Sequence, residues 1–135
     1  MNQGIFTAKL QELEREYGRM GSLMELWQQE EPEKLRGLLD TVTREFQANQ
    51  HLLEKTVEGS RSPAIAALAQ AQLDYYRKAG DILEARLPGY LHSEDSTPGE
   101  DRQEAAALYA EYAMDLAAQS IRYAMMAALK ALEMQ

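Results

Sequence analysis

Arg44 and His51 are the two residues whose types and spacing come closest to a catalytic pair. Six residues separate them, so in a helix they lie two turns apart on one face. A histidine transfers protons near neutral pH, and an arginine guanidinium binds a phosphate through paired N–H donors. The pair is suited to phosphodiester hydrolysis, and it is equally ordinary for the solvated back of a helix.

This spacing resembles the Arg-x4-6-His motif of the HEPN ribonucleases, which are also small helical bundles. The resemblance covers two residues, and it implies that His51 would act as acid or base while Arg44 steadies a phosphate. The characteristic polar residue after the arginine is missing, because Glu45 stands there. The family motif also tends to lie on a later helix. A HEPN-like hydrolase is therefore the alternative interpretation of this sequence.

The spacing of the histidines and carboxylates matches no motif for binding a metal or a cofactor. Di-iron bundles use a Glu-x-x-His pattern, but Ala48 and Gly89 stand three residues before His51 and His92. The carboxylates of the later helices fall on polar backs, where solvation is the simpler interpretation. We therefore expect no metal site and no cofactor.

Five tyrosines fall on the apolar sides of the two later helices. The simple interpretation places their rings at the edge of a core with the hydroxyls in water. The sharper one is an aromatic groove that receives a partner helix or a small apolar ligand. The candidates are Tyr75, Tyr76, Tyr109, Tyr112 and Tyr123.

Composition narrows the class of protein. The chain has 135 residues, a formal net charge of −8 and no cysteine. The acidic balance disfavours nucleic acid and anionic membranes as partners. No basic stretch followed by an apolar run begins the chain, so we expect no signal peptide. A soluble cytoplasmic protein without a membrane partner is the expectation.

Helix signals divide the chain into four segments, at about 5–29, 32–58, 63–87 and 98–134. Pro32 and Pro63 suit first helical positions, Ser62 and Thr97 are expected N-caps, and Glu100 completes a capping box. Pro88 and Gly89 should end the third helix and open a loop over 88–97. We predict one all-α domain over 1–135, an antiparallel up-down-up-down four-helix bundle with a long Ala-rich C-terminal helix.

Apolar periodicity is strongest in the first and last helices. The first carries an unbroken heptad stripe, which favours one continuous helix across Gly18–Ser22. Its members are Phe6, Leu10, Leu13, Tyr17, Met20, Met24 and Trp27. The last helix combines a ridge of alanines with large apolar residues on both flanks, so its apolar face is about twice the width of an ordinary one. Such a helix needs at least two neighbours.

Two amides interrupt otherwise apolar stripes near the middle of their helices. Asn49 and Gln72 lie equally far from the turn between the second and third helices. An antiparallel hairpin would bring them level, where two carboxamides could exchange hydrogen bonds. We therefore predict a buried polar pair that fixes the register of the helices.

No pattern in the sequence is specific enough to indicate an enzyme. We predict a non-enzymatic helical bundle that acts by binding another protein or by self-association, for example as a homodimer. The alternative is a small-molecule-binding or hydrolytic bundle that uses the tyrosines or the Arg44 and His51 pair.

Overall fold

The computed structural model describes residues 3–135, and of Gln3 the backbone alone. Our expectation about a signal peptide rests partly on Met1 and Asn2, which lie outside this range. Every regular element in the described range is a helix, so the predicted all-α class is confirmed. None of the helices found there is both long enough and apolar enough to cross a membrane.

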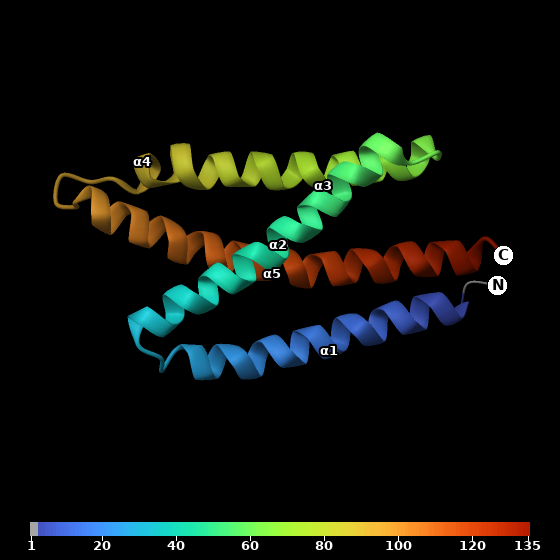
Figure 1. The fold of residues 1–135 in the computed structure, drawn as a ribbon, viewed down its shortest axis with the longest axis horizontal. Coiled ribbons are helices and arrows are strands. Elements are labelled where there is room, and N and C mark those ends of the chain that lie inside the picture. The colour runs from blue at the N-terminus through green and yellow to red at the C-terminus, as the bar shows by residue number, and fades with distance from the viewer. Residues whose placement is uncertain (1–2) are drawn as a thin grey trace. The chain divides into compact units, whose positions relative to one another are not determined.

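Residues 3–135 form four long helices with their connections, and two short helical segments follow the third helix (Figure 1). The elements are α1 (Gln3–Trp27), α2 (Pro32–Gly59), α3 (Pro63–Asp81), the π-helical turn η1 (Ile82–Arg86), α4 (Leu87–Leu91) and α5 (Pro98–Glu133).

The helix N-caps at Ser62 and Thr97 are formed as the sequence predicts. Ser62 is the N-cap of α3 and its hydroxyl accepts a hydrogen bond from the backbone N–H of Ile65 at 3.4 Å. Thr97 and Glu100 form the predicted capping box at the start of α5, with two reciprocal bonds of 3.1 Å. These bonds satisfy backbone N–H groups that have no partner within the helix.

α1 is continuous across Gly18–Ser22, as the phase of its heptad stripe predicted. The Ser22 hydroxyl donates to the carbonyl of Gly18 at 3.3 Å, one turn back, which is a bond of the helix interior. The two glycines therefore lower the local helix propensity without breaking the helix.

The end of the third helix differs from the prediction. Pro88 and Gly89 were expected to stop it, but both lie inside α4. The helical run continues through the π-helical turn into α4, and its backbone departs from helical geometry at Arg86, where φ is −122° and ψ is −38°. A proline in the first turn of a helix loses no hydrogen bond, so Pro88 can begin α4. The irregular connection is therefore limited to residues 92–97.

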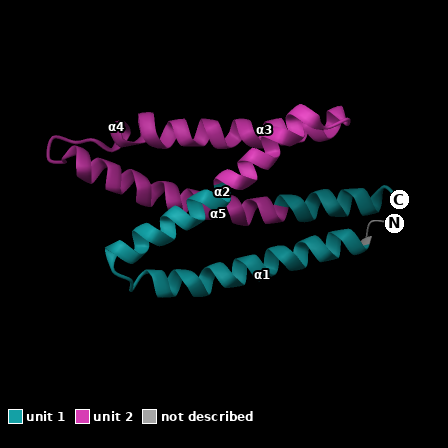
Figure 2. Cartoon of the chain, in the orientation of Figure 1, with its two compact units in different colours: residues 1–46, 123–135 teal, residues 47–122 magenta. Residues whose placement is uncertain are grey.

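The chain divides into two compact units, which we describe separately (Figure 2). Unit 1 contains residues 1–46 and 123–135, and unit 2 contains residues 47–122.

Unit 2 holds the buried apolar residues of the described range. They are Ala69 and Leu73 of α3 and Ala105 of α5, each at most 4% exposed. Two of the three are alanines, whose small side chains leave little between neighbouring backbones. An ion pair of 3.8 Å between Arg77 of α3 and Glu54 of α2 adds an exposed link between these helices.

Unit 1 contains no buried side chain among its described residues. Within unit 1, α1 and residues 32–46 of α2 diverge from the turn that joins them (Figure 2). Near this turn they form an apolar groove of about 390 Å³, lined mainly by Met24, Trp27, Leu35, Leu38, Leu39 and Val42. Further along α1 the heptad stripe is open, because Leu13, Tyr17 and Met20 are 42%, 66% and 55% exposed.

Candidate functional site

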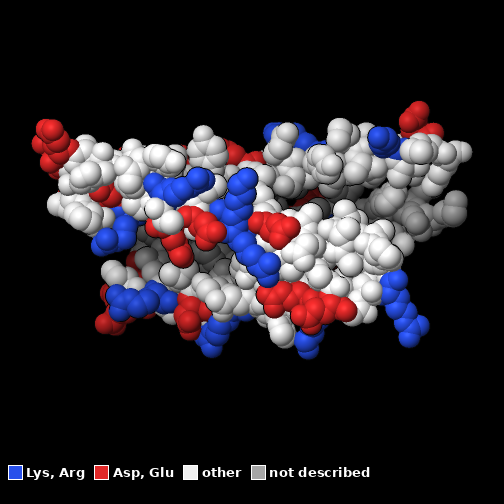
Figure 3. Space-filling view, turned by 90° about the horizontal axis from the view of Figure 1, so that it is seen from above, with Lys and Arg blue, Asp and Glu red and all other residues white. Residues whose placement is uncertain are grey.

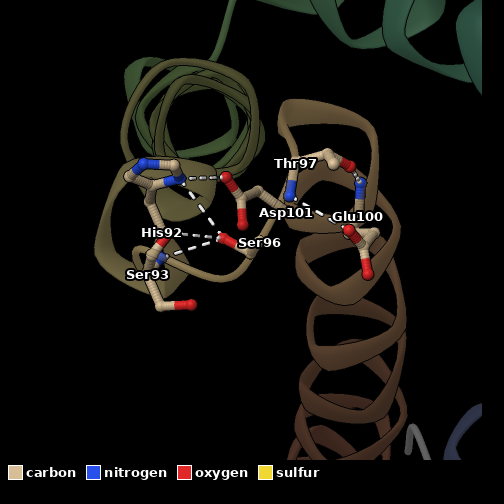
Figure 4. Close-up of polar contacts among 6 residues, drawn as sticks. All are labelled: His92, Ser93, Ser96, Thr97, Glu100 and Asp101. Carbon is tan, nitrogen blue, oxygen red and sulfur yellow. Dashed lines mark hydrogen bonds and ion pairs between the residues drawn. The ribbon is translucent and has the colours of Figure 1, made fainter.

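The densest polar cluster in the described residues lies where α4 passes into α5 (Figure 4). His92 ends α4, Ser93 and Ser96 belong to the connecting loop, and Asp101 lies in the first turns of α5. The capping box at Thr97 fixes the start of α5, and this directs Asp101 back toward the loop. Local sequence therefore builds the cluster within ten residues.

The shortest bond in the cluster joins His92 Nδ1 to Asp101 Oδ2 at 2.6 Å. A carboxylate can only accept, so the ring proton lies on Nδ1 and is donated to Asp101. The His92 side chain is half exposed, which leaves Nε2 as the free acceptor of the ring. This arrangement fixes the tautomer of the histidine.

Ser96 links the cluster to the loop backbone. Its Oγ accepts from the N–H of Ser93 at 2.9 Å and donates to the carbonyl of the same residue at 3.1 Å. The same Oγ lies 3.3 Å from His92 Nδ1. The hydroxyl is therefore held by the loop and by the ring nitrogen that also faces Asp101.

This geometry excludes a serine nucleophile activated by His92. A catalytic triad requires the serine at one ring nitrogen and the carboxylate at the other. Here Ser96 and Asp101 both approach Nδ1. The cluster therefore does not have the geometry of a hydrolytic triad, and its hydrogen bonds instead join the 92–97 loop to the start of α5.

Asp101 is the buried charged residue of the described range, with 4% exposure. The Ser96 hydroxyl and the His92 imidazole lower the pKa of Asp101, and burial of the carboxylate opposes that shift. Its second oxygen, Oδ1, is buried without a protein hydrogen-bond partner. The charged form is therefore the one that the surroundings favour.

Sequence reasoning missed this cluster because it tested His92 only for the Glu-x-x-His pattern. The available signal was the capping box itself. A capping box at 97–100 fixes the direction of α5, so an acidic residue at 101 faces a histidine that ends the preceding helix.

Four of the five candidate tyrosines lie in unit 2, and three of them influence one another. The rings of Tyr75 and Tyr76 meet edge to face, with centroids 5.5 Å apart. Burial raises the pKa of Tyr109, and the neighbouring hydroxyls of Tyr75 and Tyr76 add to the increase. Tyr112 is 68% exposed, and Tyr123 belongs to unit 1. Tyr75, Tyr76 and Tyr109 therefore form an aromatic cluster, and the groove of five tyrosines stays a prediction.

Arg44 and His51 each pair with an acidic neighbour on their own helix. Arg44 forms an ion pair with Asp40 at 2.8 Å, and His51 Nδ1 lies 3.7 Å from Glu54. All four side chains are well exposed. No hydrogen bond or ion pair among the described residues joins Arg44 to His51, so the structure shows two solvated pairs.

Asn49 and Gln72 are both exposed, and no hydrogen bond between them occurs in the described range. The predicted burial of this polar pair is therefore not found. The prediction assumed that neighbouring helices cover each other's stripes along their whole length. The chain leaves much of these stripes uncovered, so water reaches both amides.

The described residues contain no group of three side chains that could hold a metal ion. In comparisons with known proteins, no family model, no curated protein and no solved structure matches the chain.

Proposed function

We propose that this chain is an interaction protein whose helices complete their core by association, either with a second copy or with another protein. The single observation that carries the proposal is the solvent exposure of the chain's large apolar side chains. In the described range 22 of them are exposed, whereas the buried apolar residues are one leucine and two alanines. Scattered exposed apolar residues are normal, but such an excess marks an interaction surface.

The make-up of the surface supports the same proposal. Charged side chains of both signs leave broad uncharged areas between them on the face shown in Figure 3.

We further propose that in the assembled state the four long helices take up the antiparallel up-down-up-down order. The short connections at residues 28–31 and 60–62 favour antiparallel neighbours. In that order the wide apolar face of α5 would find the two neighbours that it needs.

Sedimentation velocity at several micromolar concentrations tests the proposal. We expect species of at least twice 15.3 kDa, and a melting temperature that rises with protein concentration, as mass action requires for a folded oligomer. A single-chain mass at high concentration, with a melting temperature independent of concentration, would contradict self-association and leave only a different protein as partner.

A further inference from the structure

We propose that the open part of the α1 stripe, formed by Leu13, Tyr17 and Met20, is a coiled-coil seam that receives α1 of a second copy of this chain. The inference rests on the self-association proposed above and assigns its surface. It concerns unit 1, whose described residues form no buried core of their own.

The spacing of the stripe is that of a coiled coil. Its seven members alternate intervals of four and three residues without a break from Phe6 to Trp27. A heptad pattern sustained over three heptads is typical of a coiled-coil seam, whereas an ordinary surface helix follows a period of 3.6 residues. The two ends of the stripe are half buried and its middle is exposed, so the middle is where a partner helix is missing.

Charges beside the seam match a second copy. With Leu10 and Tyr17 at a positions and Leu13 at d, Lys9 is the g position of one heptad and Glu14 is the e position of the next, and these positions flank the seam on opposite sides. In a parallel pair, Lys9 of one copy falls opposite Glu14 of the other. A hollow of about 330 Å³ lies on this part of α1, lined by Leu13 and by Lys9, Glu12 and Glu16. The seam therefore offers apolar surface with charges of both signs at its rim.

The area to be covered favours a copy over a short peptide. Stable homodimers bury about 2,000–5,000 Å² in total, and the 22 exposed large apolar side chains of the described residues offer more surface than a short peptide covers. A second copy brings an equal set of exposed apolar side chains. A twofold pairing then covers both copies at once, and it closes without leaving a free end.

A matched pair of variants tests the seam. Tyr17→Glu places a charge at the seam, and Gln11→Glu places the same charge on an exposed site of α1 outside the stripe. Tyr17 is 66% exposed in the single chain, so its replacement leaves the helix content of that chain unchanged. We expect Tyr17→Glu to sediment as a single chain and Gln11→Glu to keep twice that mass, with equal helix content by circular dichroism.

Cross-linking gives a second measurement, because the chain contains no cysteine of its own. In a parallel seam Tyr17→Cys forms a disulfide with its copy, and in an antiparallel seam a mixture of Leu13→Cys and Tyr17→Cys forms the mixed disulfide. Arg15→Cys, on the opposite face, should form neither. Either seam disulfide supports the proposal.

The failures are distinguishable. If Tyr17→Glu remains a dimer and no seam disulfide forms, self-association stands and this inference is overturned. If the wild-type chain sediments as a single species of 15.3 kDa at high concentration, self-association and this inference are both overturned, and only a different protein is left as the partner. In that case a compact sedimentation coefficient would mean that another part of the same chain covers the seam.

Discussion

Unit 1 and unit 2 are built from similar amphipathic helices, yet they solve the burial of apolar surface differently. Unit 2 buries Leu73 with two alanines and closes a polar cluster around Asp101. Unit 1 buries no described side chain and leaves the middle of its best apolar stripe open. Amphipathic helices alone therefore do not make a core, because each stripe also needs a covering neighbour.

The largest expected effect comes from truncating a buried leucine in unit 2. Leu73 is 2% exposed, so Leu73→Ala should lower the free energy of unfolding by about 2–5 kcal/mol, through lost burial and the cavity left behind. Leu39→Ala in unit 1 removes the same atoms from a side chain that is 67% exposed. Urea denaturation of dilute protein should show a change of less than about 0.5 kcal/mol there.

The same two variants separate the single chain from the assembly. Leu39 lines the groove at the α1–α2 turn, so any cost of Leu39→Ala should grow with protein concentration if association covers that groove. The cost of Leu73→Ala should not depend on concentration. Equal effects of both variants in dilute solution would mean that the contrast between the units is wrong.

Removal of a helix N-cap should have the next largest effect on the free energy of unfolding. Ser62→Ala and Thr97→Ala each remove a hydroxyl that accepts from a backbone N–H at the start of a unit 2 helix. Each should cost about 1 kcal/mol of unfolding free energy. Thr41→Ala is the matched control in unit 1, since the Thr41 hydroxyl only donates to the Gly37 carbonyl within the exposed part of α2. Thermal melts should place that control within about 0.5 kcal/mol of wild type.

Local signals in the sequence predicted the helices well, because caps and heptad phases act over a few residues. The proline starts, the Ser62 cap and the capping box at Thr97 are all present as expected. The end of α3 differs from the prediction, because a proline that can stop one helix is equally suited to the first turn of the next, and Pro88 lies in the first turn of α4.

Longer-range features were harder to predict because they depend on which stripes meet. Periodicity identifies the apolar face of α1, but it does not say whether that face is covered by the same chain. The cluster of His92 and Asp101 depends on the direction in which α5 leaves the loop, which a search for fixed motifs does not include. Side-chain type and spacing therefore indicate the elements better than the site.

A dependence on pH is expected at Asp101 of unit 2. The pKa of Asp101 is lowered in the folded chain, so between that value and its ordinary value of 3.8 the unfolded state binds more protons. Asp101 therefore stabilises the fold at neutral pH, and this contribution is lost as the pH falls below about 4. Asp101→Asn should melt at a lower temperature than wild type at neutral pH, and the difference should shrink in acid. A difference independent of pH would mean that the charge plays no part.

The smallest expected effects concern Asn49 and Gln72. Both side chains are exposed, so replacing either amide with leucine leaves no buried polar group without a partner. Asn49→Leu and Gln72→Leu should each change the free energy of unfolding by less than about 0.5 kcal/mol, and the double variant should show the sum of the two, as independent surface sites do. A double-mutant cycle by urea denaturation measures this directly. If each single variant destabilised strongly and the double variant recovered the loss, the two amides would meet inside a closed bundle. That outcome at high protein concentration alone would mean that assembly brings the helices together, and its appearance in dilute protein would contradict the open arrangement of these stripes.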